Sequence, residues 1–129
     1  MSIATFRGGV HPYEGKDLSK DLPIKTVQPK KELVFPMGQH IGAPATPIVA
    51  KGDKVLVGQK IGEASGFISA NICSSVSGTV KAVEPRMLLN GSQATCVVIE
   101  NDGEYVAIEG LGEDRDYTKL SADEIRDIV

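Results

Sequence analysis

The sequence predicts an all-β fold, a small sandwich or barrel of short strands, and three observations support this fold class. Glycine and proline number 14 and 7 in a chain of 129 residues, which exceeds their average share and favours a turn-rich β protein over a helix bundle. The apolar runs are short, and a turn signal follows each of them after a few residues. No helical pattern of roughly 10–15 residues separates the runs, so a doubly wound parallel sheet is not expected.

Length and composition describe one soluble domain. The chain is 41% hydrophobic and 24% charged, which excludes a disordered chain or a membrane span. Six bases against three acids give residues 1–31 a positive charge, whereas three bases against ten acids make residues 100–129 acidic. With aromatic residues at only 5%, this distribution predicts no nucleic-acid partner. Residues 1–6 lack the pattern of a signal peptide, so we expect a cytosolic chain in which Cys73 and Cys96 are two buried free thiols.

Residues 1–31 are predicted to form an extended arm that packs on the domain. Gly8 and Gly9 precede the kink that Pro12 imposes. Two further prolines continue the extended or turn conformation. Such an arm is either disordered or laid across a partner surface, and the frequency of its apolar side chains favours packing.

Residues 32–110 are predicted to form the β domain. Asn90-Gly91, between two apolar runs, predicts a two-residue hairpin turn in which both residues need positive φ. The core is expected to contain Val55, Ile61 and Val80 with their neighbours. The expected strands are, in order, residues 32–35, 47–50, 54–57, 60–61, 71–74, 79–83, 87–89, 95–99 and 105–108.

Residues 111–129 are predicted to be an acidic linker and the start of a helix. Ser121 and Glu124 fit the S-x-x-E capping box. The acids of the first turn suit the helix dipole. The helical pattern stops after about two turns, too few for a helix that stands alone. We therefore expect the chain to be the N-terminal piece of a longer protein, followed by a further domain.

The most informative stretch has the skeleton G-D-x-V-x-x-G-Q-x-I over residues 52–61. Gly52 permits a left-handed turn, and the Asp53 carboxylate can bond the backbone beyond it. A second tight turn, at residues 77–78, enters a later strand. Together the two segments resemble the biotinyl and lipoyl domains, which implies the barrel-sandwich hybrid architecture within the all-β class.

A carrier domain of that type presents one lysine for acylation on the hairpin between its two half-units. The corresponding residues 64–71 contain no lysine, and none occurs between Lys60 and Lys81. The missing lysine counts against a biotin or lipoyl carrier. That carrier, an independent enzyme domain and a generic protein-interaction β domain remain the alternative functions.

A closer resemblance covers residues 6–103. The segments FRGGVHP at residues 6–12 and PMGQHIGAP at residues 36–44 are similar to the RnfC family (also called RsxC), the C subunits of the Rnf electron transport complex. The skeleton described above and two later segments, SGTV and IENDG, follow in family order. One departure is that the family commonly has a histidine, often followed two residues later by proline, where this chain has Cys73 and Ser75.

The resemblance implies a scaffold module of a membrane-bound, ion-translocating ferredoxin:NAD oxidoreductase complex. The subunit would lie peripherally on the cytoplasmic face of the membrane, which it meets only through the complex. Its expected partners are the other Rnf subunits and the downstream domains of its own parent chain. In the family, those downstream domains bind 4Fe-4S clusters and resemble flavin- and NADH-binding domains. We expect no cofactor in the present chain.

No catalytic or metal site is expected in the chain. His11 and His40 each lie in a loop rich in glycine and proline, and the spacing places no third ligand or carboxylate beside them. Loop residues of specific type on a rigid β scaffold often carry function. We therefore expect Arg7, His11, Gln39 and His40 to form a contact face toward another domain or subunit.

Overall fold

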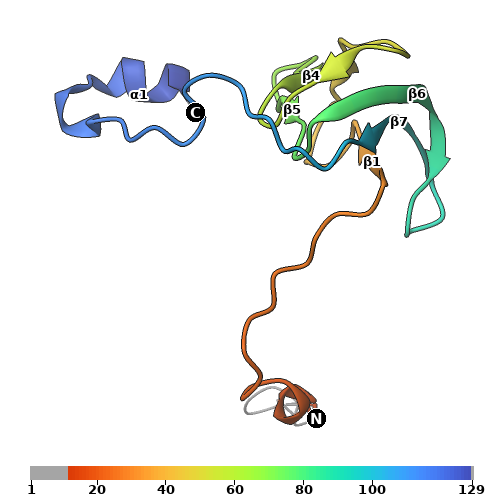
Figure 1. Ribbon diagram of the computed structural model, residues 1–129. Helices are drawn as coiled ribbons and strands as arrows, with labels where there is room; N and C mark the ends of the chain where they lie inside the picture. The colour runs from red at the N-terminus through yellow and green to blue at the C-terminus, as the bar shows by residue number, and fades with distance from the viewer. Residues whose placement is uncertain (1–11, 129) are drawn as a thin grey trace, which may run out of the picture.

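The computed structural model describes residues 12–128 and shows a curled β barrel with an extended segment on each side (Figure 1). The predicted all-β class is confirmed. In chain order the elements are η1 (Lys16–Leu18), β1 (Glu32–Pro36), β2 (Thr46–Pro47), β3 (Lys54–Val55), β4 (Lys60–Glu63), β5 (Ile72–Cys73), β6 (Gly78–Met87), β7 (Gln93–Asn101), η2 (Tyr117–Lys119) and α1 (Ala122–Ile128).

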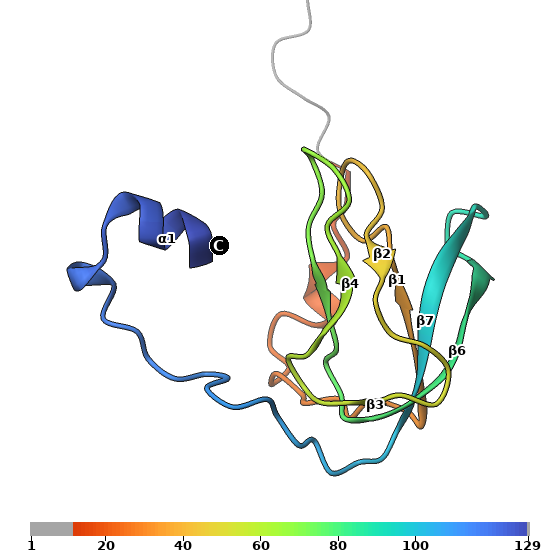
Figure 2. The same cartoon turned by 90° about the horizontal axis from the view of Figure 1, so that it is seen from above.

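The strands form two antiparallel sheets. One has the order β1-β7-β6-β3 and the other has the order β2-β4-β5. The long β6–β7 hairpin forms the centre of the first sheet. Figure 2 shows this hairpin beside the narrower second sheet. Segment 105–108, predicted as a strand, pairs only through one parallel bridge between Val57 and Ala107.

The core lies between the two sheets. Val55, Ile61 and Val80 are buried, as predicted from the turn skeleton. Met37 covers Gly62 so closely that a Cβ on this glycine would lie 2.7 Å from the Met37 sulfur atom. The other buried members of the core are Phe35, Ala45, Ile72, Val76, Val97 and Ile99. A valine, isoleucine, phenylalanine or methionine side chain contributes roughly 1.5–3 kcal/mol to the free energy of unfolding when it is fully buried.

Gly52 adopts the left-handed conformation that the sequence predicts, with φ +98°. The predicted bond of Asp53 is wrong in direction, because its carboxylate accepts the N–H of Ala50, before the turn, at 2.8 Å and not one beyond it. The second hairpin differs too. At Asn90-Gly91 only the glycine has positive φ, so the predicted two-residue turn is wrong. Instead the Leu88 N–H donates to the Ser92 carbonyl at 2.8 Å, which closes a three-residue loop with glycine in its left-handed position.

β6 is also longer than predicted, because residues 79–83 and 87–89 were expected to be separate strands. In the structure one strand runs through Pro85, which pairs with Thr95 of β7. β3 pairs only with residues 78–79 of β6, so Pro85 lies where this edge has no strand neighbour. A proline is tolerated there because no partner strand requires its missing N–H.

The two flanking segments add little to the core. Leu18, Ile24 and Val27 of the arm are 84%, 102% and 83% exposed, so these three side chains bury little surface against the barrel. The predicted capping box of α1 is confirmed: the Ser121 N–H and hydroxyl donate to the Glu124 carboxylate and hold its pKa below the usual range. Within residues 12–128 no helix is long and apolar enough to cross a bilayer.

Candidate functional site

Two loops meet at one pole of the barrel and form its most distinctive surface. Loop 37–45 joins β1 to β2, and loop 64–71 joins β4 to β5. Thr46 pairs with Glu63, so the end of the first loop and the start of the second are held side by side. We call this pair of loops the apex; Figure 2 shows both loops extending beyond the strands at one end of the barrel.

Hydrogen bonds join the two apex loops. The Ala43 N–H donates to the Ile68 carbonyl at 2.9 Å, and the Ser69 hydroxyl donates to the Ala43 carbonyl at 2.8 Å. The Ser65 hydroxyl donates to the Pro44 carbonyl. Gly42 brings the first loop against the second. It has φ +97°, and a Cβ atom on it would lie 2.0 Å from the Ile68 carbonyl oxygen. Only glycine fits both this φ and this approach.

His40 is a further connection between the loops. Its Nε2 atom accepts the Ala70 N–H at 3.3 Å, so the proton of the neutral ring is assigned to Nδ1, which donates to the Ile41 carbonyl at 3.1 Å. Both ring nitrogens are therefore used inside the apex. This half-buried side chain holds the loops together.

The predicted contact residues are brought together only in part. Gln39 lies beside His40 at the apex and is exposed, whereas Arg7 and His11 lie outside the described residues. Sequence reasoning missed the most exposed apolar side chains here: Ile41, Phe67 and Ile68 are 88%, 105% and 60% exposed. The available signal was charge, because residues 37–50 and 64–80 contain no Asp, Glu, Lys or Arg.

The opposite pole, which we call the anchor pole, comprises residues 74–77 and 101–106. The buried Ser77 hydroxyl donates to the Asp102 carboxylate at 2.7 Å and accepts the Val106 N–H at 3.0 Å. That hydroxyl, followed by the Glu104 N–H, holds the pKa of Asp102 below its ordinary value. The chain enters and leaves the barrel here, since the Asn101 N–H donates to the Lys31 carbonyl at 2.8 Å.

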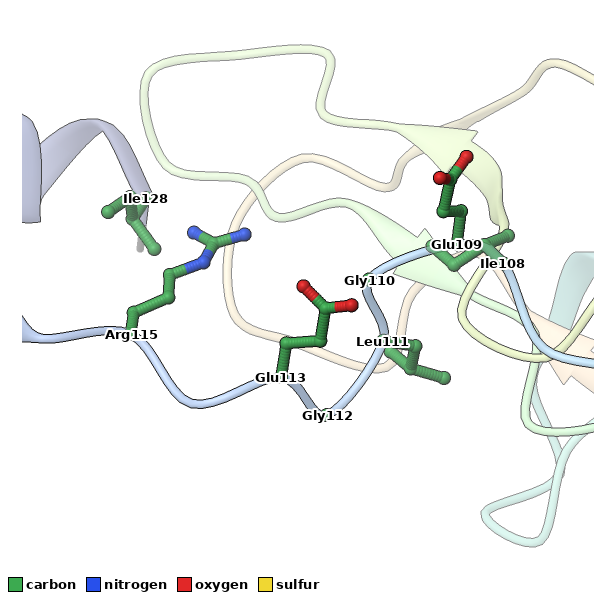
Figure 3. A pocket seen from close by; sticks show the side chains of 8 residues that line it. All are labelled: Ile108, Glu109, Gly110, Leu111, Gly112, Glu113, Arg115 and Ile128. Atoms are coloured by element: carbon green, nitrogen blue, oxygen red, sulfur yellow. The ribbon is translucent and has the colours of Figure 1, made fainter.

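A surface pocket of about 400 Å³ lies away from the apex, between the segment that follows the barrel and the end of α1 (Figure 3). Glu109, Glu113 and Arg115 supply its charged groups, and Ile108, Leu111 and Ile128 its apolar walls. One continuous segment of chain lines almost all of it. Among the described residues that line it, none is a histidine or cysteine or carries a hydroxyl group that could act as a nucleophile.

The cysteines are both free, but the predicted burial holds for one of them only. Cys96 is buried on β7, and burial raises the pKa of its thiol. Cys73 is exposed on β5, because the side chains of a two-residue edge strand alternate and that of Ile72 takes the core side. In the part of the chain that the structure describes, no three His, Cys, Asp or Glu side chains gather as metal ligands would.

Fold and apex together define a barrel-sandwich domain. Its β4–β5 loop carries the exposed Phe67, whereas an acyl carrier would need a lysine in this loop. Comparison with known families agrees with this class and specifies it. The chain belongs to the family described as the RnfC barrel sandwich hybrid domain, whose family model matches residues 4–104.

Related proteins are the C subunits of ion-translocating complexes. The C subunit of the Na⁺-translocating ferredoxin:NAD⁺ oxidoreductase complex of Acetobacterium woodii is 46% identical over 99 residues, which are 77% of this chain and 22% of that protein. Its counterpart in the proton-translocating complex of Clostridium ljungdahlii is 37% identical over 98% of this chain and 28% of its own length. The corresponding protein of the ion-translocating oxidoreductase complex of Vibrio cholerae is 32% identical over 96% and 16%. The chain thus spans between 16% and 28% of the length of these relatives.

Proposed function

We propose that the chain is the scaffold module of the RnfC protein in a membrane-bound, ion-translocating ferredoxin:NAD⁺ oxidoreductase complex. The observation that carries the proposal is the family match over residues 4–104, together with relatives whose names place them in such complexes. The barrel supports this role because its sheets enclose one core, and the exposed side chains of Ile41 and Phe67 lie on loops that hydrogen bonds hold in place.

We further propose that the three parts of the chain divide this work. Residues 1–31 and the Gln39-His40 turn would face a neighbouring domain or subunit, with Arg7 and His11 on the arm side of that face. Residues 32–110 would hold the face rigid, and residues 111–129 would lead to the next domain. The exposure of Gln39 at the apex and the exposed arm from residue 12 to 30 support this division.

The redox chemistry would lie elsewhere in the parent protein. We propose that its other domains carry 4Fe-4S clusters together with flavin and NADH sites, and that the parent protein sits peripherally on the cytoplasmic face of the membrane. The present chain supports this division of labour through its cysteines, since one is exposed on β5 and the other is buried on β7. Such a pair supplies no four-thiolate nest for an iron–sulfur cluster.

The test is to express the full product of the parent gene with an affinity tag and to isolate it from solubilised membranes. We expect co-purified partners from the complex, bound iron and flavin, and oxidation of NADH. A parent product without iron, flavin or membrane partners would contradict the proposal. Arg7→Ala and His40→Ala, made in the same background, test the contact face: both should weaken binding of the partner, and unchanged binding by both would remove that face.

A further inference from the structure

We propose that the apex inserts Ile41, Phe67 and Ile68, named here the apex triad, into an uncharged apolar pocket on a different protein of the complex. This inference rests on the proposed function, because it assigns a partner to the RnfC scaffold module. The same geometry gives His40 a positioning role in the contact face: its nitrogens bond within the apex and hold the loops whose apolar side chains supply the contact surface.

Exposure is the first argument. Phe67 is 105% exposed and Ile41 is 88% exposed, so these side chains contribute almost nothing to the barrel. Ile68 is 60% exposed, although its backbone carbonyl accepts the Ala43 N–H. The two isoleucines thus lie on loops that are bonded to each other, and the phenylalanine is next to one of them in sequence. Large apolar side chains grouped on a polar surface are typical of an interaction site.

Charge is the second argument. The chain as a whole is 24% charged, yet residues 37–50 and 64–80 contain no Asp, Glu, Lys or Arg. The ion pair nearest along these strands, between Lys60 and Glu63 at 2.8 Å, lies at the start of loop 64–71 and outside it. An uncharged apolar centre with ionic groups at its margin is the composition of the buried part of a protein interface.

Rigidity is the third argument. Four hydrogen bonds and the close approach at Gly42 fix the two loops against each other before any partner arrives. The Ala64 N–H also donates to the Asn71 side chain at 2.9 Å, which closes the base of loop 64–71. A preorganised tip loses little conformational freedom on binding, so more of its contact energy appears as affinity.

The position of the apex selects the occupant. The chain enters at Lys31 and leaves at Asn101, both at the anchor pole, so its flanking segments depart from the end opposite the apex triad. A second copy is disfavoured, because the surface pocket described above carries Glu109, Glu113 and Arg115 and so does not match an uncharged tip. A lipid surface is disfavoured too, since peripheral insertion usually relies on nearby Lys or Arg, which both loops lack.

Photo-crosslinking in the assembled complex tests the occupant directly. Phe67 is replaced by p-benzoylphenylalanine in the full-length parent protein, the complex is irradiated in native membranes, and the crosslinked peptide is identified by mass spectrometry. We expect a crosslink to an apolar segment of another protein of the complex. A crosslink to the parent protein itself, to a second copy or to lipid would overturn the proposal. Leu89, 110% exposed on the β6–β7 hairpin, is the matched position, and equal crosslinking from it would also count against the apex.

Substitution tests the energetic part. Phe67→Ser should lower the fraction of the parent protein retained in the purified complex at least about tenfold, because a central aromatic side chain carries much of an interface's binding energy. Leu89→Ser should leave retention unchanged. The retained fraction should also depend only weakly on salt concentration. Unchanged melting temperatures of the isolated chains would show that both variants fold.

The two levels of the proposal fail in different ways. A wild-type parent protein that does not co-purify with any complex would overturn the proposed function and the docking site with it. A wild-type protein that co-purifies only as well as the Phe67→Ser variant would overturn the docking site alone.

Discussion

Two serine hydroxyls at opposite poles of the barrel make the same pattern of hydrogen bonds. At the anchor pole, the Ser77 hydroxyl donates to Asp102 and accepts the Val106 N–H. At the apex, the Ser69 hydroxyl donates to the Ala43 carbonyl and accepts the Ser65 N–H at 3.1 Å. Ser77 is 1% exposed, whereas Ser69 is only half-buried.

This difference in burial separates the work of the two poles. A buried donor that loses its acceptor pays its full desolvation cost, whereas an exposed one is rescued by water. The anchor pole therefore stabilises the fold, with the Ser77 hydroxyl turned inward. The apex uses the same bonds to shape a surface, and turns Ile41 and Phe67 outward. Hydrogen-bond pattern alone does not tell which role a loop has; burial does.

The largest expected effect comes from the glycines that pack against a carbonyl at each pole. A Cβ on Gly78 would lie 2.0 Å from the Glu100 oxygen, with φ at +153° and β7 fixed on the other side. Gly78→Ala should therefore lower the free energy of unfolding by roughly 3 kcal/mol in urea titration. Gly42→Ala meets the Ile68 oxygen at the same 2.0 Å, but its neighbour is a surface loop that can move.

We expect Gly42→Ala to cost roughly 1–2 kcal/mol and to speed amide exchange at Ala43, whose N–H bonds to Ile68. Gly52→Ala is the control, because φ is +98° there, close to the value at Gly42, and no atom lies within 4 Å of the added Cβ. It isolates the cost of the backbone conformation. Equal losses at Gly78 and Gly42 would show that the two poles are equally coupled to the core.

The second prediction compares the serines directly. Ser77→Ala leaves the Val106 N–H without its acceptor in a part-buried site and should destabilise the chain by about 1–2 kcal/mol. Ser69→Ala removes the same two bonds at the half-buried apex and should cost less than about 0.5 kcal/mol. Thermal and urea unfolding of the two variants would measure the difference. A Ser69→Ala cost as large as that of Ser77→Ala would refute the division between the poles.

The sequence predicts the turn skeleton of residues 52–61 better than either pole, and the reason is contact distance. The turn at Gly52 and the burial of Val55 and Ile61 follow from neighbours a few residues apart, so local chemistry sufficed. Both poles depend on bonds between distant positions, separated by 26 and 30 residues at the apex and by 25 and 29 at the anchor pole, which no local pattern encodes. The sequence predicts two strands in place of the long β6, because a proline such as Pro85 locally indicates the end of a strand.

His40 provides the third prediction, a smaller effect confined to the apex. His40→Ala removes the acceptor of the Ala70 N–H, so exchange of this amide should accelerate, while the free energy of unfolding changes by less than about 0.5 kcal/mol. His40→Gln is the matched variant, because its side-chain oxygen can accept the same N–H. Hydrogen exchange followed by NMR distinguishes them, and a slow Ala70 amide in His40→Ala would contradict the assigned bond.

The smallest expected effect concerns charge at the anchor pole. The Ser77 hydroxyl and then the Glu104 N–H hold the pKa of Asp102 below its ordinary value of 3.8. The folded chain thus binds this proton less tightly than the unfolded chain, so the carboxylate adds stability above pH 3.8, which is lost as pH falls through the folded-state pKa. Asp102→Asn keeps an oxygen acceptor but removes the charge.

Wild type should therefore be more stable than Asp102→Asn at neutral pH, and the gap should close in acid, as urea titrations at several pH values would show. Because Asp102 lies near the surface, the gap should stay below that caused by Ser77→Ala. In a Ser77→Ala background the main cause of the lowered pKa is gone, so the pH dependence of the gap should shrink. A gap that persists unchanged into acid, or that ignores Ser77, would mean that this hydroxyl serves Val106 alone and that the anchor pole, like the apex, gains nothing from charge.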